Sequence, residues 1–435
     1  MRIYLDYASS TPVHPEVEAA MRPYFSAIFG NPGSLHLFGQ EAIAALDRGR
    51  ETIAAALGAD FREIIFTGSA TEANNLALRG TIKVFKANYP RVIPKIIVSS
   101  IEHESVLETA RNLEKDGAEV ICLPVDRRGY VNLKHLETAL NEQTVLVSVM
   151  YASNEIGTIQ PIKEISEIIA DFKRERRKTF SPGAATRPSG QGVSRSETSE
   201  GASPVKPLAG RLNGSLEKKF SDSYPFFHTD ASQAFQFLDC GVKKLGVDLM
   251  TISAHKIYGP KGVGALYIRE LKPGTHNLKP IITGGGQEFS LRSGTENVPL
   301  IVGFAKAVEL IQKNKEREAK RLRELSEYFL GGLKKIYQKI ELNGRGEKDE
   351  RLPNILNIYF PNYEAEDLFL KFDLRGLAVS VGSACRSRSV GPSYVLQALG
   401  FTGDRIKKSL RISLGRPTVK SEIDKGLGII KIILK

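Results

Sequence analysis

Seven short apolar runs, separated by turns and helix-like stretches, constrain the fold of this chain more than any other feature. They carry β-branched and apolar residues on consecutive positions, as expected for strands buried on both faces. They are IIFT (64–67), KIIVSS (95–100), EVICLPV (119–125), VLVSVM (145–150), FFHTD (226–230), LMTISA (249–254) and GALYIR (264–269). Helix-like stretches lie between several of them, at residues 71–86, 105–115, 133–140 and 162–172. This alternation predicts an α/β fold in which helices cover both faces of a mainly parallel, seven-stranded sheet.

The rest of the chain predicts a second, smaller unit. Apolar residues recur every three or four positions between residues 301 and 340, which indicates one long amphipathic helix or two helices in series around Gly331 and Gly332. After it come the strand-like runs ILNIYF, LAVSV and SLRISL and one helix-like stretch, at residues 355–360, 377–381, 409–414 and 364–375. We therefore predict a large domain over residues 13–314 and a smaller α+β domain formed by residues 1–12 and 315–435.

The net charge of +12 is concentrated in one segment of the 435 residues. Residues 173–222 contain 11 Lys and Arg against 5 Asp and Glu, so this short segment carries half of the excess. Its Gly, Ser, Pro, Arg and Glu residues surround only isolated apolar side chains, which cannot offset the entropy of ordering. Residues 174–222 are therefore predicted to be a disordered insert. Charge confined to such a segment says little about what the folded body binds, which argues against direct binding to nucleic acid.

Cysteine usage and hydropathy bear on the cellular location. Three cysteines are an odd and sparse set, which does not suit a disulfide scaffold and fits a reducing cytoplasm. The apolar runs are too short to span a bilayer, and Asp6 stands where a signal peptide would need an apolar core. We predict a cytoplasmic protein without a membrane segment.

Polar residues that suit cofactor chemistry follow five of the predicted strands. The turn TGSATEANN opens a helix, so its backbone N–H groups and Thr71 suit an anion, although a capped strand-to-helix turn would look the same. Lys256 follows LMTISA; a lysine desolvated there can form a Schiff base with an aldehyde, whereas a solvated loop lysine is the simpler interpretation. Asp230 suits a pyridinium nitrogen or a helix N-cap. His103 suits stacking on a flat ring or a helix start, and Asn154 follows a further strand.

These five positions are expected to converge, because the carboxyl ends of parallel strands meet at one edge of a sheet, where open α/β folds build their sites. Together they offer a phosphate cup, a ring-stacking histidine, an acid and an amine. An aldehyde cofactor with a phosphate tail needs these groups, so the sequence predicts pyridoxal phosphate. The loop GGGQEFSLRSGTEN, which contains Arg292 and Thr295, is either a flexible connection or an approach to an anion or a neighbouring subunit.

Cys385 is the candidate nucleophile among the three cysteines. It lies in VGSACRSRSVG, where Arg386 and Arg388 would lower the pKa of its thiol and raise the thiolate fraction. Cys122 and Cys240 lie in the apolar runs EVICLPV and FLDCGV, so we expect both in or near the core.

These motifs closely resemble the cysteine desulfurases of the NifS/IscS type, within the class-V aminotransferase-like family of fold-type I pyridoxal-phosphate enzymes. The resemblance runs from YLDYASSTP through GSATEANN, EHESV, NEIGTIQPI, HTDASQA, SAHKIYGPKG, GGGQE, RSGTEN and GSAC to SLRISLGR. It covers the chain apart from the insert, and SAHKIYGPKG with RSGT and GSAC is a specific combination. Two features depart from the family pattern: the insert itself, and Arg386, where a small or hydroxylated residue is usual.

The resemblance implies a role for each matched residue. Lys256 would hold the cofactor covalently and move a proton at the substrate Cα, and Cys385 would carry a persulfide. The other cofactor contacts would come from the phosphate-binding Ala70, Thr71, Ser253 and His255, from Asp230 at the ring nitrogen, Gln233 at the phenolic oxygen, the stacking His103, and Asn154, with Thr295 reaching the phosphate from the partner subunit of a homodimer. Asn154 and Arg411 would clamp the substrate carboxylate. No intrinsic metal is implied, and whether Cys385 ligates a shared iron–sulfur cluster is left open.

The reaction implied by the resemblance converts L-cysteine to L-alanine and leaves a persulfide on Cys385. The sulfur would pass to an acceptor protein, either an iron–sulfur scaffold or a tRNA-thiolation protein. A selenocysteine lyase or another fold-type I enzyme, such as an aminotransferase, is the alternative within the same chemistry, although an aminotransferase has no use for Cys385. A non-catalytic RNA-binding or scaffold protein that uses the basic insert is the alternative from a different class.

Overall fold

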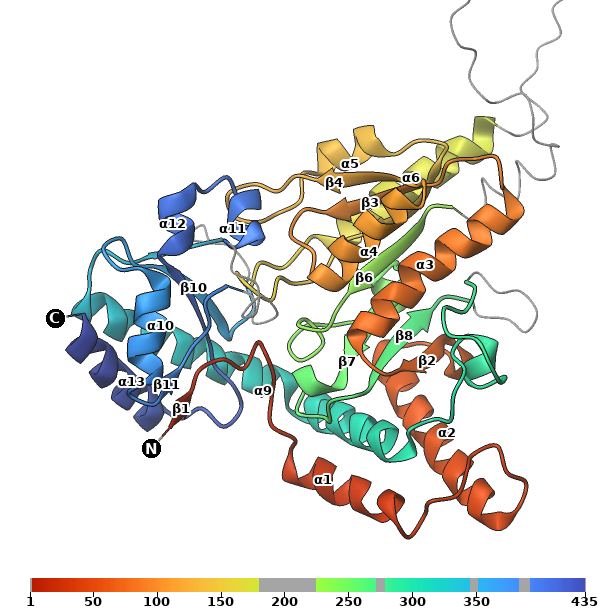
Figure 1. Ribbon diagram of the computed structural model, residues 1–435, viewed down its shortest axis with the longest axis horizontal. Coiled ribbons are helices and arrows are strands. Elements are labelled where there is room, and N and C mark those ends of the chain that lie inside the picture. The colour runs from red at the N-terminus through yellow and green to blue at the C-terminus, as the bar shows by residue number, and fades with distance from the viewer. Residues whose placement is uncertain (1, 180–223, 271–277, 345–350, 383–391, 435) are drawn as a thin grey trace, which may run out of the picture.

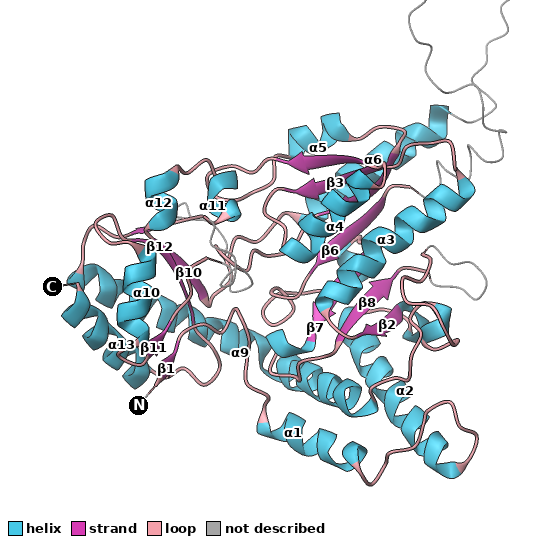
Figure 2. Cartoon of the chain, viewed as in Figure 1, coloured by secondary structure: helices cyan, strands magenta, loops and turns pink. Residues whose placement is uncertain are grey.

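The seven predicted strands form one sheet in the computed structural model, which describes residues 2–179, 224–270, 278–344, 351–382 and 392–434 (Figures 1 and 2). Their bounds are β2 Ile64–Thr67, β3 Lys95–Ser99, β4 Glu119–Leu123, β5 Thr144–Ser148, β6 Phe226–Asp230, β7 Leu249–Ser253 and β8 Gly264–Ile268. In space the order is β2-β8-β7-β6-β5-β3-β4. The five strands from β4 to β7 in this order are mutually parallel, whereas β8 runs antiparallel to β7 and β2. The predicted α/β fold with a mainly parallel sheet is confirmed.

Strand β4, one of the two edge strands of the sheet, differs from the other six strands in its burial. The other strands are buried along their whole length, but in β4 only Leu123 is buried. Cys122 is exposed on this strand, so the prediction that it lies in or near the core is wrong. The apolar run indicated a strand correctly but could not show how much of it distant elements cover, since the other edge strand, β2, is buried along its whole length. Cys240 is buried, as predicted.

Helices cover both faces of the sheet (Figure 1). On one face, α3 (Ala70–Asn88) and α4 (Glu104–Lys115) pack against the strands, with the apolar residues of α3 recurring at helical spacing in a single core cluster. The other face packs against a second, larger cluster of buried apolar residues. Helices within residues 15–57, 133–179 and 242–336 contribute side chains to this cluster. The remaining helices of this part of the chain, apart from the long helix described below, are α1 Pro15–Met21, α2 Leu37–Leu57, α5 Leu133–Ala139, α6 Ile162–Thr179 and α8 Val242–Leu245, with the 3₁₀ turns η1 Arg22–Phe25 and η2 Phe61–Glu63.

Helix α6 extends further than the sequence predicted. It continues to Thr179, so the first residues of the predicted insert at 174–222 are helical. Arg176 is buried and its Nη2 donates to the carbonyl oxygen of Glu142 at 3.0 Å, which ties this last turn to the body of the protein. Residues 180–223, and with them nearly all of the predicted insert, lie outside the described residues.

The long amphipathic pattern is one continuous helix, α9 (Val298–Ile336), rather than two. It passes through Gly331 and Gly332 without a break. A Cβ at Gly332 would lie 2.4 Å from a methyl carbon of Leu427, so close packing against α13 (Lys420–Ile433) explains this glycine. The predicted domain division at residue 314 falls inside this helix, which runs from beneath the large sheet to the smaller lobe (Figure 1).

The smaller lobe is built on two short sheets. An antiparallel sheet has the order β12-β10-β9, and β1 pairs in parallel with β11, which brings the N-terminal segment onto this lobe. The elements are β1 Ile3–Tyr4, β9 Glu341–Leu342, β10 Ile355–Tyr359, β11 Leu377–Ala378, β12 Ser409–Ser413, α10 Ala365–Asp373, α11 Tyr394–Ala398 and α12 Gly403–Lys407. Both termini lie here, at the left of Figure 1. Among the described helices of the whole chain, none has a stretch long and apolar enough to cross a membrane.

Candidate active site

A cavity of about 210 Å³ lies at the carboxyl ends of the parallel strands, where the sequence placed the site. The loops after β2, β3, β5, β6 and β7 all contribute to its wall. Nine predicted residues line it: Ala70, Thr71, His103, Asn154, Asp230, Gln233, Ser253, His255 and Lys256. The convergence expected from a parallel sheet is therefore present in the structure.

Lys256 projects into this cavity from a 3₁₀ turn, η4 (Ala254–Lys256), directly after β7. Its Nζ donates to the carbonyl oxygens of Ala8 at 2.8 Å and Ser9 at 2.7 Å. The next turn is held in place because Tyr258, which has a φ of 66°, donates its N–H to Thr11 Oγ1 at 2.8 Å. The N-terminal segment is thus the partner that fixes the lysine loop.

The same N-terminal segment forms one wall of the cavity, which our reasoning from individual residues missed. Ser9 lines the cavity, and the carbonyl oxygen of Ala8 also accepts from Gln233 Nε2 at 2.8 Å. The only signal in the sequence was the motif YLDYASSTP, which is far from Lys256 along the chain.

The turn before α3 provides the predicted anion cup. Ser69 is the N-cap of this 19-residue helix, accepting from the N–H of Glu72 at 3.1 Å, and Ala70 and Thr71 follow in its first turn. Gly264 of β8 packs directly behind the turn, since a Cβ there would lie 2.9 Å from the nitrogen of Ala70. The first-turn N–H groups and the positive end of the helix dipole therefore face the cavity, as an anionic group requires.

His255 and Ser253 lie beside this cup. Ser253 Oγ and His255 Nδ1 are 3.0 Å apart, so the hydroxyl and the ring share a hydrogen bond. Burial, and then the nearby positive charge of Lys256, lower the pKa of His255 to about 4. The ring is therefore neutral at pH 7 and can contribute hydrogen bonding, but not a positive charge, to an anion in the cavity.

Asp230 stands at the end of β6, on the wall of the cavity, and is held by two donors. Asn74 Nδ2 donates to its Oδ2 at 2.8 Å, and the N–H of Ser232 donates to its Oδ1 at 2.9 Å. Asn74 Nδ2 also donates to Ser105 Oγ at 2.8 Å, which lies 2.8 Å from His103 Nδ1. Asn74 thus connects the acid to the predicted stacking ring. We did not single out Asn74, although it lies one helical turn after Thr71 in GSATEANN.

Three predicted residues do not line this cavity in the described structure. Arg411 is buried behind it, where its Nη1 donates to the carbonyl oxygen of Asn154 at 2.9 Å and its Nη2 to Asp6 Oδ1 at 2.7 Å and Ser9 Oγ at 2.6 Å. Thr295 lines a separate hollow of about 170 Å³. Cys385, with Arg386 and Arg388, lies outside the described residues.

The residues of the cavity fit pyridoxal phosphate. The Ser232 hydroxyl is buried on the cavity wall without a hydrogen-bond partner, and an orphaned group in such a place is expected to bind something. The wall also holds a buried acid at one side, an anion cup at the other and a lysine amine, which match the ring nitrogen, the phosphate and the aldehyde. Among the described residues no group of three or more His, Cys, Asp or Glu side chains could hold a metal ion.

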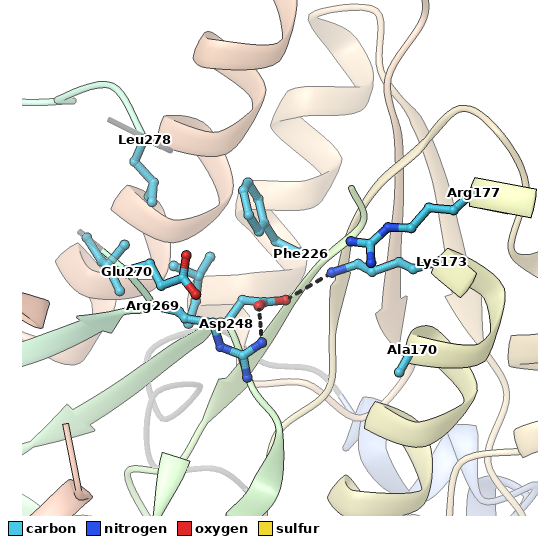
Figure 3. A pocket seen from close by; sticks show the side chains of 10 residues that line it. Ala170, Lys173, Arg177, Phe226, Asp248, Arg269, Glu270 and Leu278 are labelled. Atoms are coloured by element: carbon cyan, nitrogen blue, oxygen red, sulfur yellow. Dashed lines mark ion pairs between the residues drawn. The ribbon is translucent and has the colours of Figure 1, made fainter. Parts of the chain in front are cut away.

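A larger cavity of about 480 Å³ lies at the opposite end of the sheet, and none of the predicted residues lines it (Figure 3). Phe226 and Leu249 begin strands there, and Ile268 ends the antiparallel β8. Its central acid, Asp248, forms ion pairs with Lys173 at 3.5 Å and with Arg269 at 2.9 Å. The buried acid of this second cavity is therefore already neutralised by two lining cations.

Comparisons with known proteins agree with this geometry. The Aminotransferase class-V family profile matches residues 3–174 and 215–425. "Cysteine desulfurase IscS" of Dictyoglomus turgidum is 40% identical over 433 residues, which are 100% of this chain and 94% of that protein. A solved "NifS-like protein" superposes with a TM-score of 0.80 at 32% identity, covering 100% of this chain and 99% of that one. "SspA in complex with cysteine" superposes with a TM-score of 0.72 at 32% identity, covering 96% and 100%.

Proposed function

Because this chain belongs to the class-V aminotransferase family, we propose that it is a pyridoxal 5′-phosphate-dependent cysteine desulfurase, which takes sulfur from L-cysteine and leaves L-alanine. Relatives called cysteine desulfurase match it over its whole length at 38–40% identity, and a structural neighbour was solved in complex with cysteine. The chain also has a cysteine, Cys385, in the motif GSAC.

One observation carries the cofactor assignment: Lys256 and Asp230 lie on the same cavity, with the anion cup of Ala70 and Thr71 beside them. An amine, an acid and a helix N-terminus around one small cavity suit few other ligands. When bound, pyridoxal phosphate makes the Cα–H bond of an amino acid more acidic by withdrawing electrons into its ring.

The residues of the chain then act on the substrate and its proton. The Asp230 carboxylate, oriented by Asn74 and Ser232, would accept a hydrogen bond from the ring nitrogen and favour its protonated form. The Lys256 amine would take the proton from the substrate Cα, since it lies on the cavity wall. Asn154, on the cavity wall, would receive the substrate carboxylate, and Arg411, buried behind it, would join once its Nη2 leaves Asp6 and Ser9.

In this scheme the Cys385 thiolate is the group that first takes the sulfur atom from the substrate. The Cβ–S bond of L-cysteine breaks and an S–S bond forms on the Cys385 thiolate, while the alanine carbon takes up protons. L-cysteine and the Cys385 thiol thus become L-alanine and a Cys385 persulfide, and no outside oxidant or reductant is needed. The outer sulfur would then pass to an acceptor protein, such as an iron–sulfur scaffold or a tRNA-thiolation protein.

The proposal includes a homodimer in a reducing cytoplasm. Large apolar side chains are exposed together on the segment between η1 and the start of α2; they are Phe25, Phe29, Leu35, Leu37 and Phe38, with exposed fractions of 53% to 92%. The rings of Phe29 and Phe38 lie 5.8 Å apart, and exposed apolar side chains gathered in this way are expected to be covered by another protein surface. The free thiols of Cys122 and Cys240 are compatible with a reducing compartment.

The test is the visible spectrum of the purified protein with pyridoxal phosphate, before and after L-cysteine is added, with alanine and sulfide quantified. We expect an imine absorption band, equal amounts of alanine and released sulfur in the presence of a thiol reductant, and no sulfur release by Cys385→Ala, which should keep the band. Protein that stays colourless with the cofactor, or Cys385→Ala that still releases sulfur from cysteine, would contradict the proposal. Faster turnover of selenocysteine than of cysteine would favour the lyase alternative.

A further inference from the structure

Arg411 is a buried cation whose hydrogen bonds lead to the active-site cavity. It is 1% exposed, its Nη2 donates to Ser9 Oγ at 2.6 Å, and its Nη1 donates to the carbonyl oxygen of Asn154 at 2.9 Å. Ser9 and Asn154 both line the cavity. The guanidinium therefore lies one hydrogen bond behind the cavity wall at two points.

Asp6 is the acid that neutralises this cation. Its Oδ1 accepts from Arg411 Nη2 at 2.7 Å, and in the part of the chain that the structure describes no other acid pairs with Arg411. A lone buried charge is costly, so this pair is what makes the burial of Arg411 tolerable. Arg411 Nε is buried and has no partner among the described residues. The guanidinium thus keeps one donor unused and shares a second, Nη2, between Asp6 and Ser9.

The backbone around Asp6 is fixed to β12, the strand that carries Arg411. Ser413 of β12 donates its N–H to the carbonyl oxygen of Leu5 at 2.8 Å, and its own carbonyl oxygen accepts the N–H of Tyr7 at 3.3 Å. Asp6 and Ser413 form an isolated parallel bridge. Because β12 holds the main chain on both sides of Asp6, the carboxylate stays within reach of Arg411, and rotation of the side chain is what separates the two groups.

A substrate carboxylate would meet Arg411 as a second carboxylate in the same place. An arginine binds a carboxylate best through two parallel N–H···O bonds, and Nε and Nη2 form one such edge of the guanidinium. Nε is the unused donor, but Nη2 is held by Asp6. Two carboxylates on one edge repel each other, so the incoming group has to displace Asp6 from Nη2.

We propose that Asp6 is a positioning residue for substrate capture: it holds Arg411 as an internal carboxylate, and the carboxylate of L-cysteine takes its place. The inference rests on the proposed function. The pair has to break when substrate or product binds, and it forms again when either leaves. Asp6 therefore weakens the binding of L-cysteine and of L-alanine alike, and it favours the release of L-alanine after the sulfur has been transferred.

The experiment measures carboxylate binding separately from the chemistry. The probe 3-mercaptopropionate has the carboxylate and thiol of L-cysteine but no amine, and it is titrated calorimetrically into full-length protein with and without pyridoxal phosphate. Cysteamine, which has the amine and thiol but no carboxylate, is titrated through the visible band of the loaded protein, and so is L-alanine.

The variants change the charge of one side chain. Asp6→Asn and Asp6→Ser remove the negative charge, and Asp6→Glu keeps it. Asp248→Asn is the matched control, because Asp248 is also a buried acid that pairs with cations, at the opposite end of the sheet. Both charge-removing variants leave a polar acceptor beside Arg411, so a protein that folds poorly with one substitution can be measured with the other.

We expect Asp6→Asn to bind 3-mercaptopropionate and L-alanine about 10-fold more tightly than wild type, the effect of removing one charge-assisted competitor. Asp6→Ser should tighten both ligands in the same direction, and Asp6→Glu should bind them nearly as wild type does. Cysteamine should bind every Asp6 variant as it binds wild type, because it offers Arg411 no carboxylate.

Thermal unfolding of the cofactor-free protein gives a second measurement. In Asp6→Asn the guanidinium of Arg411 is buried without a charged partner, so we expect a lower unfolding midpoint than in wild type. A saturating concentration of 3-mercaptopropionate should raise this midpoint by more in the variant than in wild type, because the probe supplies the missing charge. Asp248→Asn should also unfold at a lower temperature, but its binding of the probe should stay at the wild-type value.

Weaker or unchanged binding of 3-mercaptopropionate in Asp6→Asn would overturn the assignment, because Asp6 would then only orient Arg411 or support the fold. Equal tightening of cysteamine, or tightening of the probe in Asp248→Asn, would overturn it too, since the effect would depend on neither the carboxylate nor the site. With Arg411→Gln already in place, Asp6→Asn should have no further effect on the probe, and a persistent effect would contradict the role of Arg411.

Failure of the proposed function would look different from failure of this inference. It would appear as wild-type protein that forms no alanine from L-cysteine. The calorimetric titrations of the cofactor-free protein would still decide whether a carboxylate competes with Asp6 for Arg411.

Discussion

The two cavities at opposite ends of the large sheet differ in how their polar groups are satisfied. In the larger cavity, Asp248 is neutralised by Lys173 and Arg269 (Figure 3). It also accepts the N–H of Phe227 at 2.9 Å. In the smaller cavity, the Ser232 hydroxyl has no partner and the first turn of α3 faces open space. Cavity volume therefore does not identify the site, whereas polar groups that converge without satisfying one another do.

The difference follows from strand direction. Parallel strands β3, β5, β6 and β7 all end at the smaller cavity, and each is followed by a loop that can carry a functional group. At the other end the same strands begin, and Asp248, directly before β7, attaches helix α6 to the sheet through Lys173. The predictions below test this contrast, beginning with the largest expected effect.

Removal of the amine should abolish the chemistry at the smaller cavity. We expect Lys256→Ala to lower alanine formation by about 1000-fold or more and to remove the imine band, because no other described lysine lines this cavity. Alanine formation and absorbance measure the two effects. Lys173→Ala at the larger cavity is the control and should keep both; a loss of the band in that variant instead would reverse the comparison between the cavities.

Neutralising the acid at the end of β6 should have the next largest effect. Asp230→Asn keeps the size of the side chain but loses its negative charge, so we expect alanine formation to fall by about 100-fold. Its partners Asn74 and Ser232 favour a carboxylate, and one of their donors would face the new NH₂ group. Steady-state rates with saturating cofactor measure the change, and a rate within threefold of wild type would mean that Asp230 only shapes the wall.

The corresponding change at the larger cavity should affect stability alone. Asp248→Asn removes the negative charge that pairs with two cations. We expect it to lower the free energy of unfolding by about 3 kcal/mol, which is less than for a fully buried pair because Arg269 is partly exposed. Urea denaturation gives the stability, and alanine formation per folded molecule should stay at the wild-type value. Lost activity in fully folded protein would show that the larger cavity takes part in the reaction.

Glu102, next to His103 and behind the smaller cavity, should make stability depend on pH. Burial raises its pKa from 4.5 to about 8, and its Oε2 has no partner. Between these values the native state binds more protons than the unfolded state, so its contribution is fully present below pH 4.5, falls as pH rises and is lost above about pH 8. Glu102→Gln lacks this titration.

We therefore expect Glu102→Gln to gain about 4 kcal/mol of stability relative to wild type between pH 5 and pH 9, measured by urea denaturation at several pH values. The glutamine oxygen can still accept from Ser99 and from the N–H of Met150. Parallel stability curves for the two proteins across this range would show that Glu102 is ionised in the native state at neutral pH.

Local patterns predicted most of the secondary structure and the positions of the site residues. Runs of β-branched residues placed all seven strands of the large sheet, and helical spacing placed α3, α4 and α9. The prediction was wrong for Cys122 and for the start of the insert, and for one reason. Elements distant in the sequence decide how much of β4 is buried. They also supply the contacts that hold the last turn of α6.

The sequence by itself determined the class of fold, the parallel direction of most strands and, through the residues that follow each strand, the edge at which the site would form, because side-chain periodicity and turn residues act over a few positions. Only the tertiary structure decided the strand order, the wall formed by Ala8 and Ser9 beside Lys256, and the burial of Arg411 against Asp6. Each of these contacts joins residues tens to hundreds of positions apart, and such contacts form through packing of the whole chain rather than through any local preference.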